Sequence, residues 1–191
     1  MDGMNNALLL QQAIADCGFA HSAVLPVSQV VLNRCFRDQC KSNACGNYGQ
    51  CYMCPPDVGD IDQLMAEVQR YDSAVLYQSI SSIEDSFDIE GMLEAGHLHN
   101  QCSQRIQAVL ASLPQTPWLH LSAGGCRFCE RCAKRDGLPC RAPKHALPSL
   151  EAYGVDVYHT ALNASLRYIN GANTVTYFGM VLLKEGTRWQ L

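Results

Sequence analysis

Residues 126–143 read CRFCERCAKRDGLPCRAP, the most informative stretch of this chain. It holds four cysteines with the spacing Cys126-x2-Cys129-x2-Cys132-x7-Cys140. Thiolates are soft ligands, so a crowded all-cysteine loop favours iron-sulfur clusters, zinc or copper(I) over magnesium or calcium. Bacterial ferredoxin loops follow Cys-x2-Cys-x2-Cys-x3-Cys-Pro, and this chain departs from that order only around the fourth ligand. The pattern therefore predicts one 4Fe-4S cluster bound by these four residues.

A second cysteine array lies upstream, in residues 35–56, and allows a second cluster. Its members are Cys35, Cys40, Cys45, Cys51 and Cys54, and two prolines follow the last of them. Five thiols exceed one four-ligand site, so one is spare, serves in redox chemistry or is exchanged with the downstream array. Two-cluster ferredoxins make such an exchange. The spacing leaves open whether Cys35 or Cys51 completes the upstream site.

Zinc is the main alternative to iron and sulfur as the bound metal. Four-cysteine zinc sites also use Cys-x2-Cys pairs, but the two pairs are usually separated by roughly 12 to 20 residues. The four downstream thiols lie within 15 positions of the chain. We therefore favour an iron-sulfur cluster over zinc downstream, whereas the upstream array leaves both metals open.

Composition predicts a folded protein with residues 1–191 in one domain. The chain has 191 residues, of which 48% are apolar and 17% charged, and disorder requires the opposite balance. The first residues lack the basic region of a signal peptide, and 11 cysteines leave one thiol unpaired, so we expect a cytoplasmic protein rather than a secreted disulfide scaffold. The longest C-terminal apolar run, 177–183, is far shorter than the ~20 residues that cross a bilayer. A net charge of −4 gives no basic footprint for nucleic acid, so we expect neither a membrane nor a nucleic-acid partner.

Positive charge is concentrated in the downstream cysteine segment. Between Cys126 and Lys144 there are six basic residues and only two acidic ones. The basic residues either offset the negative charge of a thiolate cluster or belong to a solvated loop. The basic residues are Arg127, Arg131, Lys134, Arg135, Arg141 and Lys144.

The hydrophobic pattern predicts alternating helices and strands. Helical spacing is present in 10–17, 61–68 and 89–113, the last ended by Pro114, and a further helix is predicted from 148 to about 168. Strands are predicted at 73–80, 118–121 and 174–183. The expected fold class is α/β, with a small sheet flanked by helices and two cysteine-rich metal-binding loops.

The predicted helix 89–113 carries a cysteine and two histidines that superficially suggest another metal site. Cys102 and His99 fall on its apolar stripe, which favours packing, whereas His97 lies about 200° around the helix from His99. We therefore do not expect these three side chains to share a metal.

Four segments resemble a family of uncharacterised, predicted metal-binding proteins found largely in anaerobic bacteria and archaea. The segments are 45–56 (CGNYGQCYMCPP), 123–132 (AGGCRFCERC), 140–143 (CRAP) and 148–157 (PSLEAYGVDV). The resemblance covers about residues 34 to 183 and concerns a domain of unknown function. It implies metal binding by Cys45, Cys54, Cys126, Cys129, Cys132 and Cys140, and less directly by Cys40 and Cys35.

The resemblance and the spacing disagree about Cys51. It falls at a position that varies in the family, yet Cys51-x2-Cys54 makes a ready chelating pair. Ser149, Glu151 and Asp156 belong to the family pattern as well. Ser149 would cap a helix with Glu151 in its first turn, and the alternative is catalysis by Glu151 or Asp156.

The sequence favours an iron-sulfur protein that transfers electrons to a partner enzyme. One alternative is an enzyme in which an iron without a cysteine ligand binds and polarises a substrate. The other alternative is a zinc-stabilised interaction module. Whether the chain is an enzyme stays open at this point.

Overall fold

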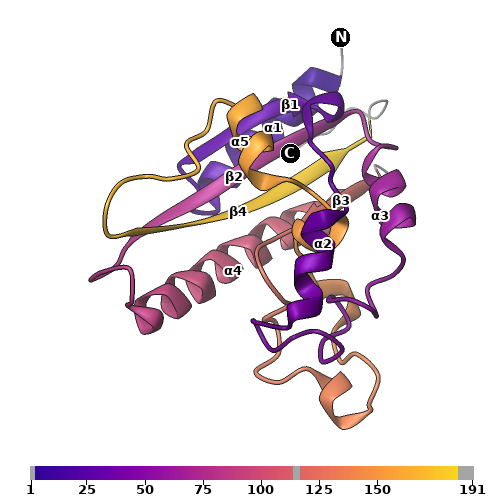
Figure 1. Ribbon diagram of the computed structural model, residues 1–191. Helices are drawn as coiled ribbons and strands as arrows, with labels where there is room; N and C mark the ends of the chain where they lie inside the picture. The colour runs from indigo at the N-terminus through magenta and orange to yellow at the C-terminus, as the bar shows by residue number, and fades with distance from the viewer. Residues whose placement is uncertain (1–2, 114–116, 185–191) are drawn as a thin grey trace.

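The computed structural model describes residues 3–113 and 117–184, which form one sheet with helices on both faces (Figure 1). The strands are β1 (His21–Pro26), β2 (Ser73–Ser82), β3 (Trp118–Leu121) and β4 (Thr174–Leu183). Their order is β1-β2-β4-β3, and neighbouring strands are antiparallel. The predicted α/β class, with a small sheet flanked by helices, is confirmed.

The strands of the sheet differ in how completely they are paired. β2 and β4 pair along their whole length, from Ser73 opposite Leu183 to Ser82 opposite Thr174. β1 pairs with β2 only as far as Gln78, so residues 79–82 of β2 continue beyond the end of β1. This leaves one edge of β2 without a β1 neighbour.

Helices cover the two faces because side chains alternate along each strand. One face packs against α1 (Gly3–Asp16) and α4 (Ile89–Ser112). The other packs against α3 (Ile61–Val68), α5 (Val157–Asn163) and the 3-10 turn η5 (Glu151–Tyr153). The first core includes Leu10, Ile14, Val75, Tyr77, Ile106, Leu110 and Val181, and the second includes Leu64, Val68, Leu76, Leu150, Ala161, Met180 and Leu182.

The remaining elements are short and lie in the connections. They are η1 (Val27–Gln29), α2 (Cys35–Gln39), η2 (Cys40–Ser42), η3 (Ala133–Asp136) and η4 (Pro143–His145). Figure 1 shows α2, with the purple chain that follows it, beside the orange chain that follows β3, at one end of the molecule. Both cysteine segments are therefore placed beyond the sheet rather than inside it.

The prediction of one helix from 148 to about 168 is wrong. Gly154 has a left-handed backbone, with φ of 74°, which ends η5 after a single turn. The chain then restarts as α5, capped by Asp156, whose carboxylate accepts a hydrogen bond of 3.0 Å from the His159 amide.

The strand β1 and the helix α2 were not predicted. Pro114, predicted to end α4, lies outside the described residues.

No helix in the described ranges is long and apolar enough to span a membrane.

Candidate metal centre

The two cysteine segments contact each other through polar side chains. Tyr52 donates a hydrogen bond of 2.9 Å to the Leu138 carbonyl, and Lys134 forms an ion pair of 2.5 Å with Asp57. Lys134 also lies over the Tyr52 ring, 5.4 Å from its centroid. These contacts join residues more than 70 positions apart, so the upstream and downstream arrays form a single lobe.

A close approach at Gly125 brings the two arrays together. A Cβ atom at this position would lie 2.9 Å from Asn47 Nδ2 and 3.3 Å from Cys54 Sγ. The glycine therefore allows the downstream loop to pack against the upstream cysteines, where a larger residue would collide. The neighbouring Gly124 has φ of 66°, a left-handed conformation that turns the chain toward Cys126.

One cavity in this lobe has a volume of about 830 Å³ and is lined by thiols of both arrays. We call it the larger thiol cavity. Its cysteines are Cys45, Cys51, Cys126, Cys129 and Cys132. The structure thus places Cys51 beside three of the four predicted downstream ligands, whereas Cys140 is half-buried and does not line this cavity.

Cys51 is the most enclosed thiol of the two arrays, with 1% of its surface exposed. Its sulfur lies within hydrogen-bonding reach of the Cys54 and Cys132 thiols and of the Met53 and Cys126 amides. The hydrogen bond from Cys54 is the largest cause that lowers the pKa of Cys51, and burial opposes it. The same hydrogen bond holds the proton on Cys54 and raises the pKa of that thiol. A thiolate is the form that binds metal, so Cys51 is electrostatically suited to be a ligand.

Amide hydrogen bonds also reach Cys126 on the other side of the cavity. Burial raises the pKa of this thiol, and the amides of Phe128 and Leu147 act in the opposite direction. Backbone N–H groups directed at cysteine sulfurs are one of the means by which proteins tune iron-sulfur clusters.

Arg127 carries a buried nitrogen that lacks a partner. Its Nη1 atom makes no hydrogen bond among the described residues, and its guanidinium packs against Gly96 of α4. Arg127, Arg131 and Arg135 all line the larger thiol cavity, although Arg131 is paired with Asp136 at 2.9 Å. An uncompensated cation beside several thiols fits a negatively charged metal-thiolate group in this cavity.

The smaller thiol cavity has a volume of about 300 Å³ and lies on the upstream side of the lobe. The thiols of Cys40, Cys45 and Cys54 line it, together with Glu151. Burial raises the pKa of Cys40, and the nearby Glu151 carboxylate raises it further. Burial likewise raises the pKa of Glu151. Cys35 is exposed and does not line this cavity.

The thiols surround these cavities without meeting at one point. Within residues 3–113 and 117–184, no three His, Cys, Asp or Glu side chains form a group able to hold a metal ion as they stand. A zinc ion needs four ligands at about 2.0 to 2.3 Å from one centre. A cluster of several atoms is wider, so its thiolates lie farther apart. The donor set of soft thiols fits a thiolate-bound metal group.

The structure also locates the other residues that the sequence analysis considered. Cys102 is buried against α1 and the sheet, as predicted from the apolar stripe of α4. Ser149 accepts a hydrogen bond of 3.1 Å from the Ala152 amide, in keeping with a capping role, and Asp156 caps α5. His97 is exposed and lines the larger thiol cavity, away from the buried His99. The sequence pattern gave no signal for that placement of His97.

Comparison with known families independently supports metal binding by this chain. The profile of a domain of unknown function, DUF2284, described as a predicted metal-binding protein, matches residues 23–183. The chain belongs to this family. The match spans both thiol cavities and the four strands except for the start of β1. No curated protein and no solved structure shows significant similarity to this member of the family.

Proposed function

We propose that this protein binds a 4Fe-4S cluster in the larger thiol cavity and transfers electrons to a partner protein. The proposed ligands are Cys51, Cys126, Cys129 and Cys132. The observation that carries the proposal is the grouping of these four thiols around one cavity of about 830 Å³ that Arg127 also lines. Cys140 is the alternative fourth ligand that spacing favours, and it lies outside this cavity.

The residues around the cavity have defined roles in this proposal. When bound, a 4Fe-4S cluster accepts and donates single electrons at a potential set by its charge, its hydrogen bonds and its exposure. The Met53 and Cys126 amides donate to Cys51, and the Phe128 and Leu147 amides donate to Cys126. Together with Arg127 they would stabilise negative charge on the sulfurs.

The partner in this proposal is a redox protein that reaches the cysteine lobe. The lobe lies at one end of the molecule, beyond the sheet, so a partner would approach it without displacing the core (Figure 1).

A second candidate function is supported by the smaller thiol cavity. Three thiols and one carboxylate, Glu151, line it, so a cluster held there would have one iron without a cysteine ligand. Such an iron binds and polarises a substrate as a Lewis acid, which is the chemistry of an iron-sulfur enzyme. A zinc-stabilised interaction module is the weakest candidate, because the thiols are spaced around cavities.

Anaerobic purification with combined assays of iron, sulfide and zinc tests the proposal. We expect brown protein with broad visible absorption and iron and sulfide in equal amounts. Colourless protein with stoichiometric zinc and no sulfide would reject the cluster and favour the zinc module.

A further inference from the structure

Positive and negative charges are separated along this chain. The downstream cysteine segment, residues 126–144, contains six basic and two acidic residues, whereas the rest of the chain contains eight basic and sixteen acidic residues. The segment is therefore positively charged, although the protein as a whole has a net charge of −4. Such a separation produces an electric field that orients a charged partner as it approaches.

The positive charge of this segment lies around the larger thiol cavity. Arg127, Arg131 and Arg135 line the cavity, together with one acidic residue, Glu130. Arg127 packs inward against α4, whereas Arg131 and Arg135 are exposed. Arg141 lies beside Arg131, where its Nη1 atom donates a hydrogen bond of 3.4 Å to the Arg131 carbonyl. We call the three exposed residues Arg131, Arg135 and Arg141 the basic rim.

The described contacts neutralise the basic rim only in part. The Asp136 carboxylate lies 2.9 Å from Arg131 and 3.8 Å from Arg141, so one negative charge serves two guanidinium groups. Arg135 donates a hydrogen bond of 3.1 Å to the Gly46 carbonyl, which has no net charge. The side chains of Arg131 and Arg141 keep 62% and 54% of their surfaces exposed. Their N–H groups are therefore accessible to carboxylates of another molecule.

An exposed apolar side chain lines the same cavity. Leu93 of α4 has 49% of its surface exposed. Arginine is enriched in protein interfaces, whose centres contain apolar contacts surrounded by polar groups. The cavity thiols Cys126, Cys129 and Cys132 are half-buried, so a protein seated on the basic rim would come close to a cluster that they hold.

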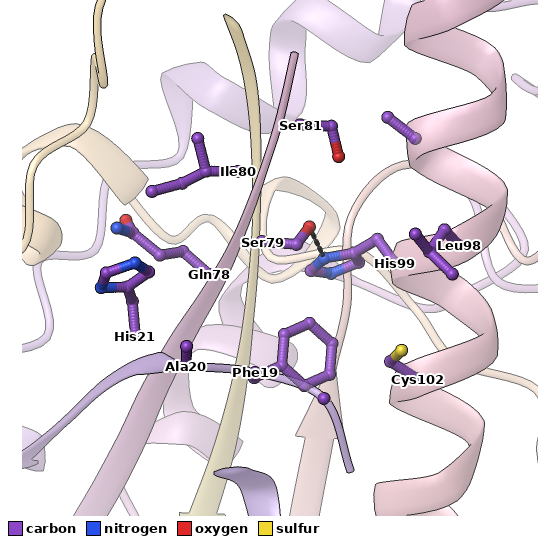
Figure 2. A pocket seen from close by; sticks show the side chains of 12 residues that line it. Phe19, Ala20, His21, Gln78, Ser79, Ile80, Ser81, Leu98, His99 and Cys102 are labelled. Carbon is purple, nitrogen blue, oxygen red and sulfur yellow. Dashed lines mark hydrogen bonds between the residues drawn. The ribbon is translucent and has the colours of Figure 1, made fainter.

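A cavity of about 360 Å³ outside the cysteine lobe lacks these properties (Figure 2). No Asp, Glu, Lys or Arg side chain lines it. Its buried histidine, His99, lies with Nδ1 2.7 Å from Ser79 Oγ. This cavity offers no charge that would attract a partner, so charge complementarity favours the larger thiol cavity as the docking surface.

We propose that the basic rim docks a redox protein with an acidic surface. The inference rests on the proposed cluster in the larger thiol cavity and specifies the chemistry of its partner. Carboxylates of that protein would accept charge-assisted hydrogen bonds from the exposed guanidinium groups. One electron passes from the reduced cluster to the oxidised redox centre of the docked protein. A nucleic acid is the less favoured anionic partner, because the net charge of −4 and the pI near 5.8 differ from those of nucleic-acid-binding domains.

Two small redox proteins of opposite charge, used as electron acceptors, test the proposal. Oxidised rubredoxin has an acidic surface, and ferric cytochrome c has a basic one. The anaerobically purified protein is reduced with dithionite, and stopped-flow absorbance follows the reduction of each acceptor between about 0.01 and 0.3 M salt. We expect the rate constant for rubredoxin to fall by about tenfold over this range, because salt screens the attraction to the basic rim. The rate constant for cytochrome c should not fall. Steering by the net charge of −4 would give the opposite result.

Two variants with the same change of charge locate the effect. Arg135→Gln removes one charge from the basic rim, whereas Arg167→Gln removes one from an exposed residue that follows α5, outside the cysteine lobe. We expect Arg135→Gln to lower the ratio of the rubredoxin to the cytochrome c rate constant by about two- to fivefold, and Arg167→Gln to leave it unchanged. The ratio largely removes any effect on the cluster potential, because both acceptors react with the same cluster.

The possible results separate this proposal from the proposed function. Protein without iron and sulfide, or with a chromophore that dithionite does not bleach, rejects the cluster itself. With a reducible cluster present, a rubredoxin rate constant that does not fall with salt overturns the docking proposal alone. Equal effects of the two variants do the same. Saturable binding of labelled single-stranded DNA that Arg135→Gln weakens would assign the basic rim to a nucleic acid and also overturn it. The salt dependence of the wild type decides the matter if Arg135→Gln does not fold.

Discussion

The Sγ atom of Cys54 lies 3.3 Å from the position that a Cβ atom on residue 125 would occupy. The upstream array therefore packs directly on the backbone of the downstream loop, and Gly125 is the residue that permits it. Both thiol cavities depend on this contact, because Gly125 lines each of them.

Replacing Gly125 by Ala tests this dependence. The added methyl would meet Asn47 at 2.9 Å and Cys54 at 3.3 Å, so we expect bound metal to fall and stability to drop by about 1–3 kcal/mol, the usual cost of overpacking. Gly124→Ala is the matched control. Its methyl meets nothing within 4 Å, although its φ of 66° carries a backbone cost, so stability decreases while metal content is retained. Equal metal loss in both variants would show that backbone conformation, not the close approach, is what matters.

Replacing a cysteine of the larger thiol cavity and replacing a cysteine of the core should have different effects on iron content and stability. Cys129→Ala removes a proposed ligand, and we expect the loss of about one cluster's iron and sulfide. Cys102→Ala removes only a buried sulfur between α4 and the sheet, so we expect unchanged iron and a stability loss of about 1 kcal/mol. Iron and sulfide assays, with urea unfolding, measure both effects. Iron loss from the Cys102 variant would place that thiol near a cluster and contradict its core role.

Cys51 and Cys140 compete for the fourth place in the downstream site. Because Cys51 lines the larger thiol cavity and Cys140 does not, we expect Cys51→Ser to make the cluster labile and Cys140→Ser to leave it in place. Serine keeps the size of the side chain and removes the thiolate. The rate of visible bleaching in the presence of an iron chelator measures the difference. If Cys140→Ser makes the cluster labile and Cys51→Ser does not, Cys140 is the fourth ligand, as the ferredoxin-like spacing predicts.

The long, regular elements of this fold were predictable from their hydrophobic periods. The α4 stripe repeats over 24 residues, and β4 ends in the apolar run 177–183, so each gives a strong local signal. β1 is six residues long and ends in Pro26, so it resembles a loop until β2 is placed beside it. The end of η5 at Gly154 depends on one left-handed residue that an otherwise helical pattern conceals.

The division of the cysteines between two cavities could not be predicted from spacing. Spacing describes which thiols are neighbours along the chain, and it pairs Cys51 with Cys54. The structure places these two sulfurs near each other but lining different cavities, and Gly125 of the downstream loop, which packs against Cys54, lines both cavities. That arrangement depends on tertiary contacts such as Lys134 with Asp57.

The buried His120 predicts a dependence of stability on pH. It lies between the Tyr77 hydroxyl, at 2.7 Å, and Gln107 Oε1, at 2.9 Å. Burial lowers the pKa of His120 to about 3, with a smaller contribution from His99, whereas an unfolded histidine titrates near 6.5. The unfolded chain therefore takes up the proton first. The stability that neutral His120 contributes is complete above pH 6.5 and is lost as the pH falls toward 3.

Urea unfolding at pH 7 and pH 5 measures this effect. A histidine of this kind lowers the free energy of unfolding by about 2 kcal/mol between pH 7 and pH 5, and His120→Gln should lose less stability over this interval by about that amount. An identical loss in the wild type and in His120→Gln would mean that other groups cause the acid sensitivity.

The ligands available in the smaller thiol cavity distinguish an electron carrier from a candidate enzyme. Its three thiols, Cys40, Cys45 and Cys54, leave one position to Glu151 or to an added ligand, and Cys35 lies outside. We expect Cys35→Ser to keep the full metal content and Cys54→Ser to reduce it. Cyanide, a small ligand for open iron, should shift the electron paramagnetic resonance spectrum of the reduced wild type.

The same spectra assign the shift to one cavity. Cys51→Ser should retain the shift, because it affects the cluster of the larger thiol cavity, whereas Cys54→Ser should lose it. Glu151→Gln should keep its metal and bind cyanide more readily, since the carboxylate no longer competes for the open position. A wild-type spectrum that cyanide leaves unchanged would mean that every iron has a full set of ligands. In that case the second candidate function fails, and electron transfer alone accounts for both cavities.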